Sequence, residues 1–230
     1  MIAITVSVNF ASILELVIPL NIKHFEKWFI ITDLADKKTV DLCHQYGKGV
    51  IEPIYFDFEA RGYLFNKGGG LRMGQLAAYY YYPESWFLIL DADILLPDNL
   101  DVYLDRLEYF PDTLYGVETR RDYPSLSAFR NNVFEEYVYG DCFTGFFQLY
   151  ADPEKYYDDS HSIDKCDDLF REKFMTKKHL RGLHVRHLGK SGIGSRYLTK
   201  DRTKNWDGAM QEDLFQMDSK INIQDLKYKI

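Results

Sequence analysis

The sequence predicts an α/β fold in which a mostly parallel central sheet is flanked by helices. Two observations lead to this prediction. Short, strongly apolar runs alternate with amphipathic segments along the first hundred residues, and two of these runs end at an aspartate. Strands that alternate with helices form right-handed βαβ units, which build parallel sheets. The second half alternates less clearly, so we expect a less regular C-terminal half.

The expected elements of the first half follow one another in βα order. Apolar and β-branched residues predict a strand at 2–8, and apolar residues at helical spacing predict a helix at 10–23, which Pro19 interrupts. A buried strand at 28–32 ends at Asp33. The remaining elements are a helix at 36–46, a strand at 50–55, a helix at 71–82 and a strand at 86–91.

The second half contains fewer clear signals. Asp98 or Asn99 can begin a helix with apolar residues on one face, and the tail after Lys200 is polar. Further elements are expected as strands at 114–119 and 143–150, a helix at 164–175 and a strand at 181–187. No repeat or low-complexity linker divides the chain, so we expect one domain over residues 1–230.

Composition and net charge limit the possible functions. A net charge of −7 without a long basic run argues against tight nonspecific nucleic-acid binding. A local basic patch stays open, because Lys177, Lys178, Arg181 and Arg186 lie close together in the sequence. The 18 Tyr, 16 Phe and 3 Trp indicate either a Tyr-rich core or an aromatic-lined cleft.

The N-terminal and cysteine patterns predict a soluble, cytoplasmic protein. The start MIAITVSV lacks a basic region and a long apolar core, and no run is long enough for a membrane span. Cys43, Cys142 and Cys166 lack metal-ligand spacing, and isolated cysteines of this kind are typical of reduced, buried thiols.

The most informative segment is Trp86–Pro97, WFLILDADILLP. In an extended chain residues i and i+2 point to the same face, so Asp91 and Asp93 are expected side by side at the end of a buried strand. Two neighbouring carboxylates repel each other unless a positive charge bridges them. Oxygen ligands suit Mg²⁺ or Mn²⁺, whose remaining positions phosphate oxygens often fill. In the alternative interpretation, Asp93 caps a turn and Asp91 accepts a backbone hydrogen bond.

This segment resembles the Asp-x-Asp signature of nucleotide-sugar-dependent glycosyltransferases of the GT-A fold, especially glycosyltransferase family 2. Other segments resemble motifs of that family in the same order along residues 3–190. They are Phe29–Asp33, Phe65–Gly74, Gly145–Tyr150, Cys166–Arg171 and His187–Gly189. The resemblance implies a GT-A, Rossmann-like fold with a nucleotide-sugar-binding half at about 1–110. An acceptor and catalytic half at about 111–200 and a C-terminal extension at 201–230 would follow.

The resemblance also implies how the donor is bound. Asp33 would contact the nucleobase, and the segment that contains Lys67 and Arg72 would face the nucleotide and its diphosphate. Asp91 would contact the ribose and the water shell of the metal, and Gly145 would lie beside the sugar and the acceptor. The glycine-rich run Lys67–Gly74 fits neither the dinucleotide-binding nor the P-loop pattern, which leaves a flexible turn into a helix N-terminus.

The same resemblance implies the metal ligands and the catalytic base. Mn²⁺ or Mg²⁺ would bind to Asp93, Asp91 and His187. Only one of His184 and His187 can face Asp93 from a strand, and the resemblance selects His187. The base would be Asp168, with its neighbour Asp167 as the alternative, because the usual Glu-Asp pair is Asp-Asp here.

The expected reaction is transfer of a sugar from a nucleoside diphosphate sugar, with UDP as the expected nucleotide, to a hydroxyl with inversion. The acceptor could be a glycan, a protein or a modified nucleobase. Two other functions remain open. A metal-dependent nucleotidyltransferase would be expected to carry a Gly-rich, basic signature near the first strand, which residues 9–23 lack. A non-catalytic carbohydrate-binding protein would not need carboxylates at a strand end.

Overall fold

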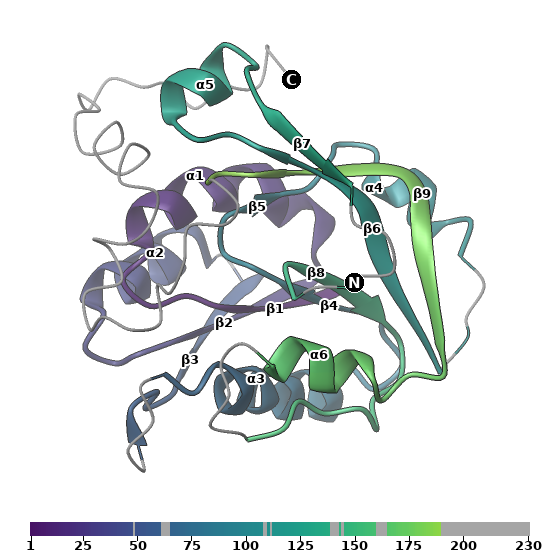
Figure 1. Cartoon of the computed structure of the whole chain (residues 1–230). Coiled ribbons are helices and arrows are strands. Elements are labelled where there is room, and N and C mark those ends of the chain that lie inside the picture. Colours follow the sequence, from purple (N-terminus) through teal and green to yellow (C-terminus); the bar gives the residue numbers. More distant parts are fainter. Residues whose placement is uncertain are drawn as a thin grey trace.

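In the computed structural model, α-helices cover both faces of one mixed β-sheet (Figure 1). The structure describes residues 1–47, 49–60, 65–107, 110, 112–138, 143, 145–159 and 165–189. Cys142 and the predicted extension at 201–230 lie outside these residues. The described strands are β1 (Ile2–Val6), β2 (Lys27–Thr32), β3 (Ile51–Tyr55), β4 (Phe87–Leu90), β5 (Ile94–Leu95), β6 (Thr113–Asp122), β7 (Glu135–Val138), β8 (Phe147–Tyr150) and β9 (Thr176–His187). The described helices are α1 (Ala11–Asn21), the 3₁₀ turn η1 (Ile22–His24), α2 (Lys37–Gly47), α3 (Lys67–Tyr81), α4 (Leu100–Leu104), α5 (Leu126–Arg130) and α6 (Cys166–Arg171).

The sheet order is β3-β2-β1-β4-β8-β6-β9-β5, and β7 pairs with β6. The first four strands in this order are parallel, which confirms the α/β prediction for this half. Antiparallel strands then follow: β8 pairs with β4 and β6 in this direction, and β5 pairs with β9, whereas β6 and β9 run parallel. These mixed strand directions correspond to the less regular C-terminal half that the sequence predicts.

A hydrophobic cluster lies on each face of the sheet. Helices α1 and α2 pack over one face and α3 and α6 over the other (Figure 1). The strands β1, β2 and β4 contribute side chains to both clusters, so they are buried on both faces. This double burial explains why their sequences are continuous apolar runs. None of the described helices is both long enough and apolar enough to cross a membrane.

Several boundaries differ from the sequence predictions. Helix α1 continues through Pro19 to Asn21, and α3 begins at Lys67 instead of residue 71. The glycines at 68–70 therefore form the first turn of α3 and not a flexible loop, because Asn66 caps the helix by accepting a hydrogen bond of 2.8 Å from the Gly69 N–H. The elements β5, α5 and β7 did not follow from the sequence.

Candidate active site

Asp91 and Asp93 lie in the turn that connects β4 to β5. The Asp91 N–H donates to the Phe146 carbonyl at 3.3 Å, and the Ile94 N–H donates to the Asp91 carbonyl at 3.3 Å, which closes the turn. The alternation predicted that the two aspartates share one face of an extended strand. This prediction is wrong, because both residues lie in a turn. Asp91 is the more accessible, with 39% of its side chain exposed, whereas Asp93 is buried.

Asp93 belongs to a buried chain of charged groups. Its Oδ2 lies 3.4 Å from His187 Nε2, and His187 Nδ1 lies 3.1 Å from Asp122 Oδ1. Arg120 completes the chain through two contacts with Asp122, of 2.7 Å from Nε and 3.0 Å from the terminal nitrogen. The structure thus places His187 beside Asp93, as expected from the sequence.

The buried chain shifts the pKa of two of its members. Burial opposes the charged form of His187, but Asp93 and Asp122 outweigh it and raise the pKa of the imidazole. Burial likewise favours the neutral form of Asp122, yet the hydrogen bond and charge of His187, together with Arg120, lower its pKa. The contacts between these groups favour the ionised forms of both His187 and Asp122. The carboxylates therefore hold the imidazole in place by charge as well as by geometry.

Lys67 connects Asp91 to helix α6. Its ammonium lies 3.2 Å from Asp91 Oδ1 and 3.1 Å from Asp167 Oδ2. The loss of water around Asp91 raises the pKa of its carboxyl, Asp93 and Asp167 raise it further, and Lys67 opposes them. The first residue of α3 thus brings the turn after β4 and the start of α6 together.

Asp167, and not Asp168, faces this site, which corrects the sequence prediction. Cys166 and Phe170 are the buried residues of α6, and this phase leaves Asp168 on the outside. Asp168 pairs with Arg171 at 2.9 Å and half of its side chain is exposed. Leu169, the next residue of α6, is also exposed.

Three residues hold Asp167 in position. The Tyr157 hydroxyl lies within hydrogen-bond distance of two acceptors, Gln148 Oε1 and, at 2.9 Å, Asp167 Oδ1, which share its one proton. The Gln148 amide donates to the Asp167 carbonyl at 3.3 Å. Gly145 leaves room for the carboxylate, because a Cβ atom there would lie 2.1 Å from the Asp167 carboxyl carbon. Any larger residue at position 145 would therefore clash with Asp167, the residue of α6 that faces the site.

Asp33 and Arg72 lie apart from this cluster. Asp33 follows β2 at the same edge of the sheet, and its Oδ1 accepts a hydrogen bond of 2.7 Å from the Ala35 N–H. Arg72 is exposed on α3, where it bonds to the Tyr157 carbonyl at 3.4 Å and lies over the Tyr156 ring. Arg72 is five residues beyond Lys67, so it points away from the direction that Lys67 takes.

Sequence reasoning missed four residues of the site. They are Arg120, Asp122, Gln148 and Tyr157. Arg120 and Asp122 follow the predicted strand 114–119 directly, and Gln148 interrupts the apolar strand predicted at 143–150, so each carried a weak signal of a polar partner. Tyr157 follows β8 in an irregular segment and carried none.

The donor atoms fit a hard divalent cation at Asp93 and His187. An oxygen and an imidazole nitrogen suit Mn²⁺. The contact from His187 Nδ1 to Asp122 is the arrangement that commonly orients a metal-binding histidine. Asp91 is directed to Lys67 instead, and the described residues contain no group of three or more His, Cys, Asp or Glu side chains placed to bind one ion. Water and ligand oxygens would have to complete the coordination.

Comparisons with known proteins give distant likenesses of fold. No protein-family model and no curated sequence matches the chain. A protein assigned as a glucose-1-phosphate thymidylyltransferase from Bacillus anthracis, crystallised with sucrose, is 11% identical with a TM-score of 0.42, over 80% of this chain and 89% of that one. Mouse xyloside xylosyltransferase 1, in its apo form, is 8% identical with a TM-score of 0.33, over 74% and 70%. At these values the likeness says nothing about the reaction of this chain.

Proposed function

We propose that this protein is a metal-dependent glycosyltransferase. It would move a sugar from a nucleoside diphosphate sugar, with UDP as the expected nucleotide, to an acceptor hydroxyl with inversion. The convergence of side chains from four separate segments supports this proposal most directly. The turn after β4, the first residue of α3, the first turn of α6 and the end of β9 meet beside the carboxyl end of β4. Ligands of α/β sheets bind beyond the carboxyl ends of the strands.

In this proposal Asp93 and His187 hold Mn²⁺ or Mg²⁺, and Asp122 orients His187. The metal supplies Lewis-acid stabilisation of charge on the leaving diphosphate. Lys67 adds a positive charge beside Asp91, where phosphate oxygens can accept hydrogen bonds from its ammonium group. Asp33, at the same edge of the sheet, remains the candidate for the nucleobase contact.

Asp167 takes the role of general base. It accepts the proton of the acceptor hydroxyl while that oxygen bonds to the anomeric carbon and the bond to the diphosphate breaks. The Tyr157 hydroxyl on Oδ1 and Lys67 on Oδ2 fix the plane of the carboxylate, and positioning of this kind is part of base catalysis. The acceptor, whether a glycan, a protein or a modified nucleobase, has to approach within hydrogen-bond distance of this group.

A thermal-shift measurement tests the proposal. UDP with Mn²⁺ should raise the melting temperature, because a ligand that binds only the native state stabilises it by mass action. EDTA should remove most of the effect, and Asp93→Asn should do the same. Asp41→Asn, an exposed change on α2, serves as the control and should respond like the wild type. Equal stabilisation by UDP with and without metal would exclude the metal role of Asp93 and His187.

A second measurement separates this reaction from that of a nucleotidyltransferase. A glycosyltransferase releases UDP from a UDP-sugar when an acceptor, or slowly water, takes the sugar. A nucleotidyltransferase instead releases pyrophosphate from a nucleoside triphosphate and a sugar 1-phosphate. Release of pyrophosphate without release of UDP would overturn the proposal.

A further inference from the structure

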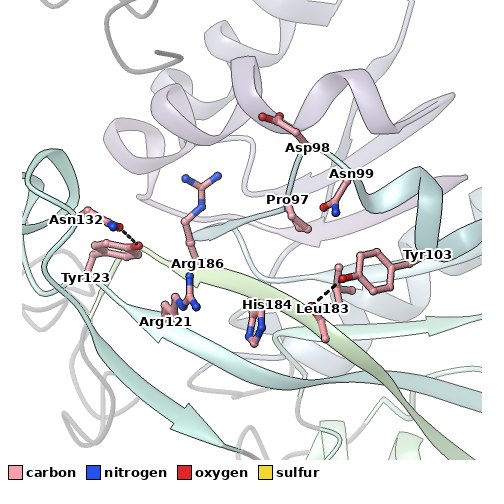
Figure 2. A pocket seen from close by; sticks show the side chains of 11 residues that line it. Pro97, Asp98, Asn99, Tyr103, Arg121, Tyr123, Asn132, Leu183, His184 and Arg186 are labelled. Carbon is pink, nitrogen blue, oxygen red and sulfur yellow. Dashed lines mark hydrogen bonds between the residues drawn. The ribbon is translucent and has the colours of Figure 1, made fainter. Parts of the chain in front are cut away.

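A polar cavity lies away from the candidate active site. It has a volume of about 460 Å³ and lies between the β6–β9 strand pair and the segment from Pro97 to Tyr103 (Figure 2). The residues that line it include none of Asp91, Asp93, Asp167 or His187. Its volume is within the range of small-molecule sites. The cavity therefore has room for a ligand of its own.

Strand alternation gives this cavity its positive charge. In the parallel register of β6 and β9, Arg121 is paired with Arg186, and the neighbouring pair Asp122 and His187 belongs to the active site. Successive residues of a strand point to opposite faces. One face of the strand pair therefore presents Asp122 and His187 to the active site. The other presents Arg121, His184 and Arg186 to the cavity (Figure 2).

One guanidinium of the cavity has no carboxylate partner. Arg121 pairs with Glu136 at 3.0 Å, and Asp98, the acidic residue among the described lining residues, forms an ion pair with Lys23. Arg186 is partly buried and forms no ion pair with the part of the chain that the structure describes. A partly desolvated charge without a counter-charge is unfavourable, so an anion that enters the cavity would be stabilised there.

The cavity also offers further hydrogen-bonding groups. His184 Nδ1 is buried and has no hydrogen-bond partner among the described residues. The Tyr123 hydroxyl donates to Asn132 Oδ1 at 2.9 Å, which leaves the amide N–H groups of Asn132 as donors at the cavity wall. The Tyr103 hydroxyl donates to the Gly182 carbonyl at 2.8 Å and can still accept a hydrogen bond.

We infer that this cavity binds a small polyhydroxylated ligand that carries one oxyanion, either a carboxylate or a phosphate. The planar guanidinium of Arg186 matches both oxyanions in geometry. His184, Asn132 and Tyr103 supply the partners that hydroxyl groups need. The single uncompensated charge favours a ligand with one anionic group.

The test uses matched sugars on the full chain, without metal or nucleotide. Glucuronate and glucose 6-phosphate carry the two oxyanions, and glucose is the neutral counterpart. Calorimetry or chemical-shift titration should show that at least one charged sugar binds about tenfold or more tightly than glucose, which corresponds to 1.4 kcal/mol. The stronger of the two charged sugars identifies the oxyanion. UDP with Mn²⁺ should not displace it, so this result does not depend on the proposed transferase activity.

Two variants locate the site. Arg186→Gln should weaken the binding of the charged sugar about tenfold or more, and Arg181→Gln, an exposed arginine of the same strand, should change it less than about twofold. A far-UV spectrum and a cooperative melt check the fold, and Arg121→Gln replaces Arg186→Gln if the latter does not fold. Equal affinities for charged and neutral sugars, no binding of either charged sugar at millimolar concentration, or equal losses in the two variants would overturn the inference.

Discussion

Asp167 and Asp168 are adjacent in the sequence but have opposite surroundings. Asp167 contacts Lys67 and Tyr157 inside the site, whereas Asp168 contacts Arg171 on the surface. Adjacent residues of a helix diverge by roughly 100°, so one of the two has to point away. The burial of Cys166 and Phe170 determines which one, because they set the inward face of α6.

The two aspartates should therefore differ in their contribution to the reaction. Asp167→Asn should lower the rate of the chemical step by about 10²-fold or more, the usual loss when a general base is removed. Asp168→Asn should change it by less than about threefold, because an exposed ion pair contributes little. Single-turnover measurements with saturating donor compare the chemical step directly. A large loss in Asp168→Asn with a near-normal rate in Asp167→Asn would return the role to Asp168.

Asp122 carries two partners in the buried chain. Arg120 and His187 both depend on it, and its side chain is about 1% exposed. Asp122→Asn should lower the free energy of unfolding by about 3–5 kcal/mol, the cost of breaking a buried ion pair. Glu136→Gln breaks the exposed pair with Arg121 on the neighbouring strand and should cost less than about 1 kcal/mol. Urea unfolding measures both; similar losses would show that the buried chain adds little stability.

At the scale of elements, α3 lies unusually close to the sheet. A Cβ atom at Gly74 would be 2.6 Å from the Ile31 side chain and 2.7 Å from that of Ile4, on the strands that the helix covers. The close approach of α3 places Lys67 where it can contact both Asp91 and Asp167. The glycines of this helix therefore serve packing and, through packing, the geometry of the site.

This packing gives a prediction with an internal control. Gly74→Ala should destabilise the fold by about 1 kcal/mol or more, because overpacking costs about 1–3 kcal/mol and the better helix propensity of alanine returns only part of it. Gly47→Ala, at the end of α2, has no atom within 4 Å of the new Cβ. It should be neutral or stabilising by up to about 1 kcal/mol. Equal effects in thermal unfolding would mean that the sheet relaxes around the new methyl group.

The sequence was a good guide to the elements that are continuous apolar runs. These runs predicted β1, β2 and β4, and the family resemblance paired Asp93 with His187, whose Oδ2 and Nε2 atoms lie 3.4 Å apart. The phase of α6 was not predictable, because its six residues contain apolar side chains on more than one face. The close packing of α3 was hidden too, since a glycine run is equally typical of a loop.

At the scale of the whole molecule, the two described cysteines are buried on opposite faces of the sheet. Cys43 belongs to the cluster under α2 and Cys166 to the cluster under α6. Burial raises the pKa of each thiol to about 12, and Asp36 and Asp167 respectively add to the shift. Both cysteines are buried thiols, as the cysteine spacing predicted.

These thiols should be almost unreactive in the native protein. In a Cys142→Ser background, alkylation at pH 8 should be slower than in denaturant by about 10³-fold or more, because the thiolate reacts and a pKa near 12 leaves very little of it. Mass spectrometry after timed quenching measures the reaction of each cysteine. Rapid modification of Cys43 or Cys166 in the native state would reveal local opening of its helix.

Among the described strands, the two edges of the sheet differ in how each discourages another strand from pairing. On β3 the Phe56 N–H donates inward to Thr32, so the nitrogen of Pro53, three residues earlier, faces outward and has no hydrogen to donate. At the opposite edge β5 is only two residues long, and β7 exposes Glu135 and Glu136. Proline, short length and charge are the means by which natural sheets avoid edge-to-edge aggregation. A wide sheet, with two strands of ten or more residues in its second half, can therefore resist pairing with another strand at the edges described.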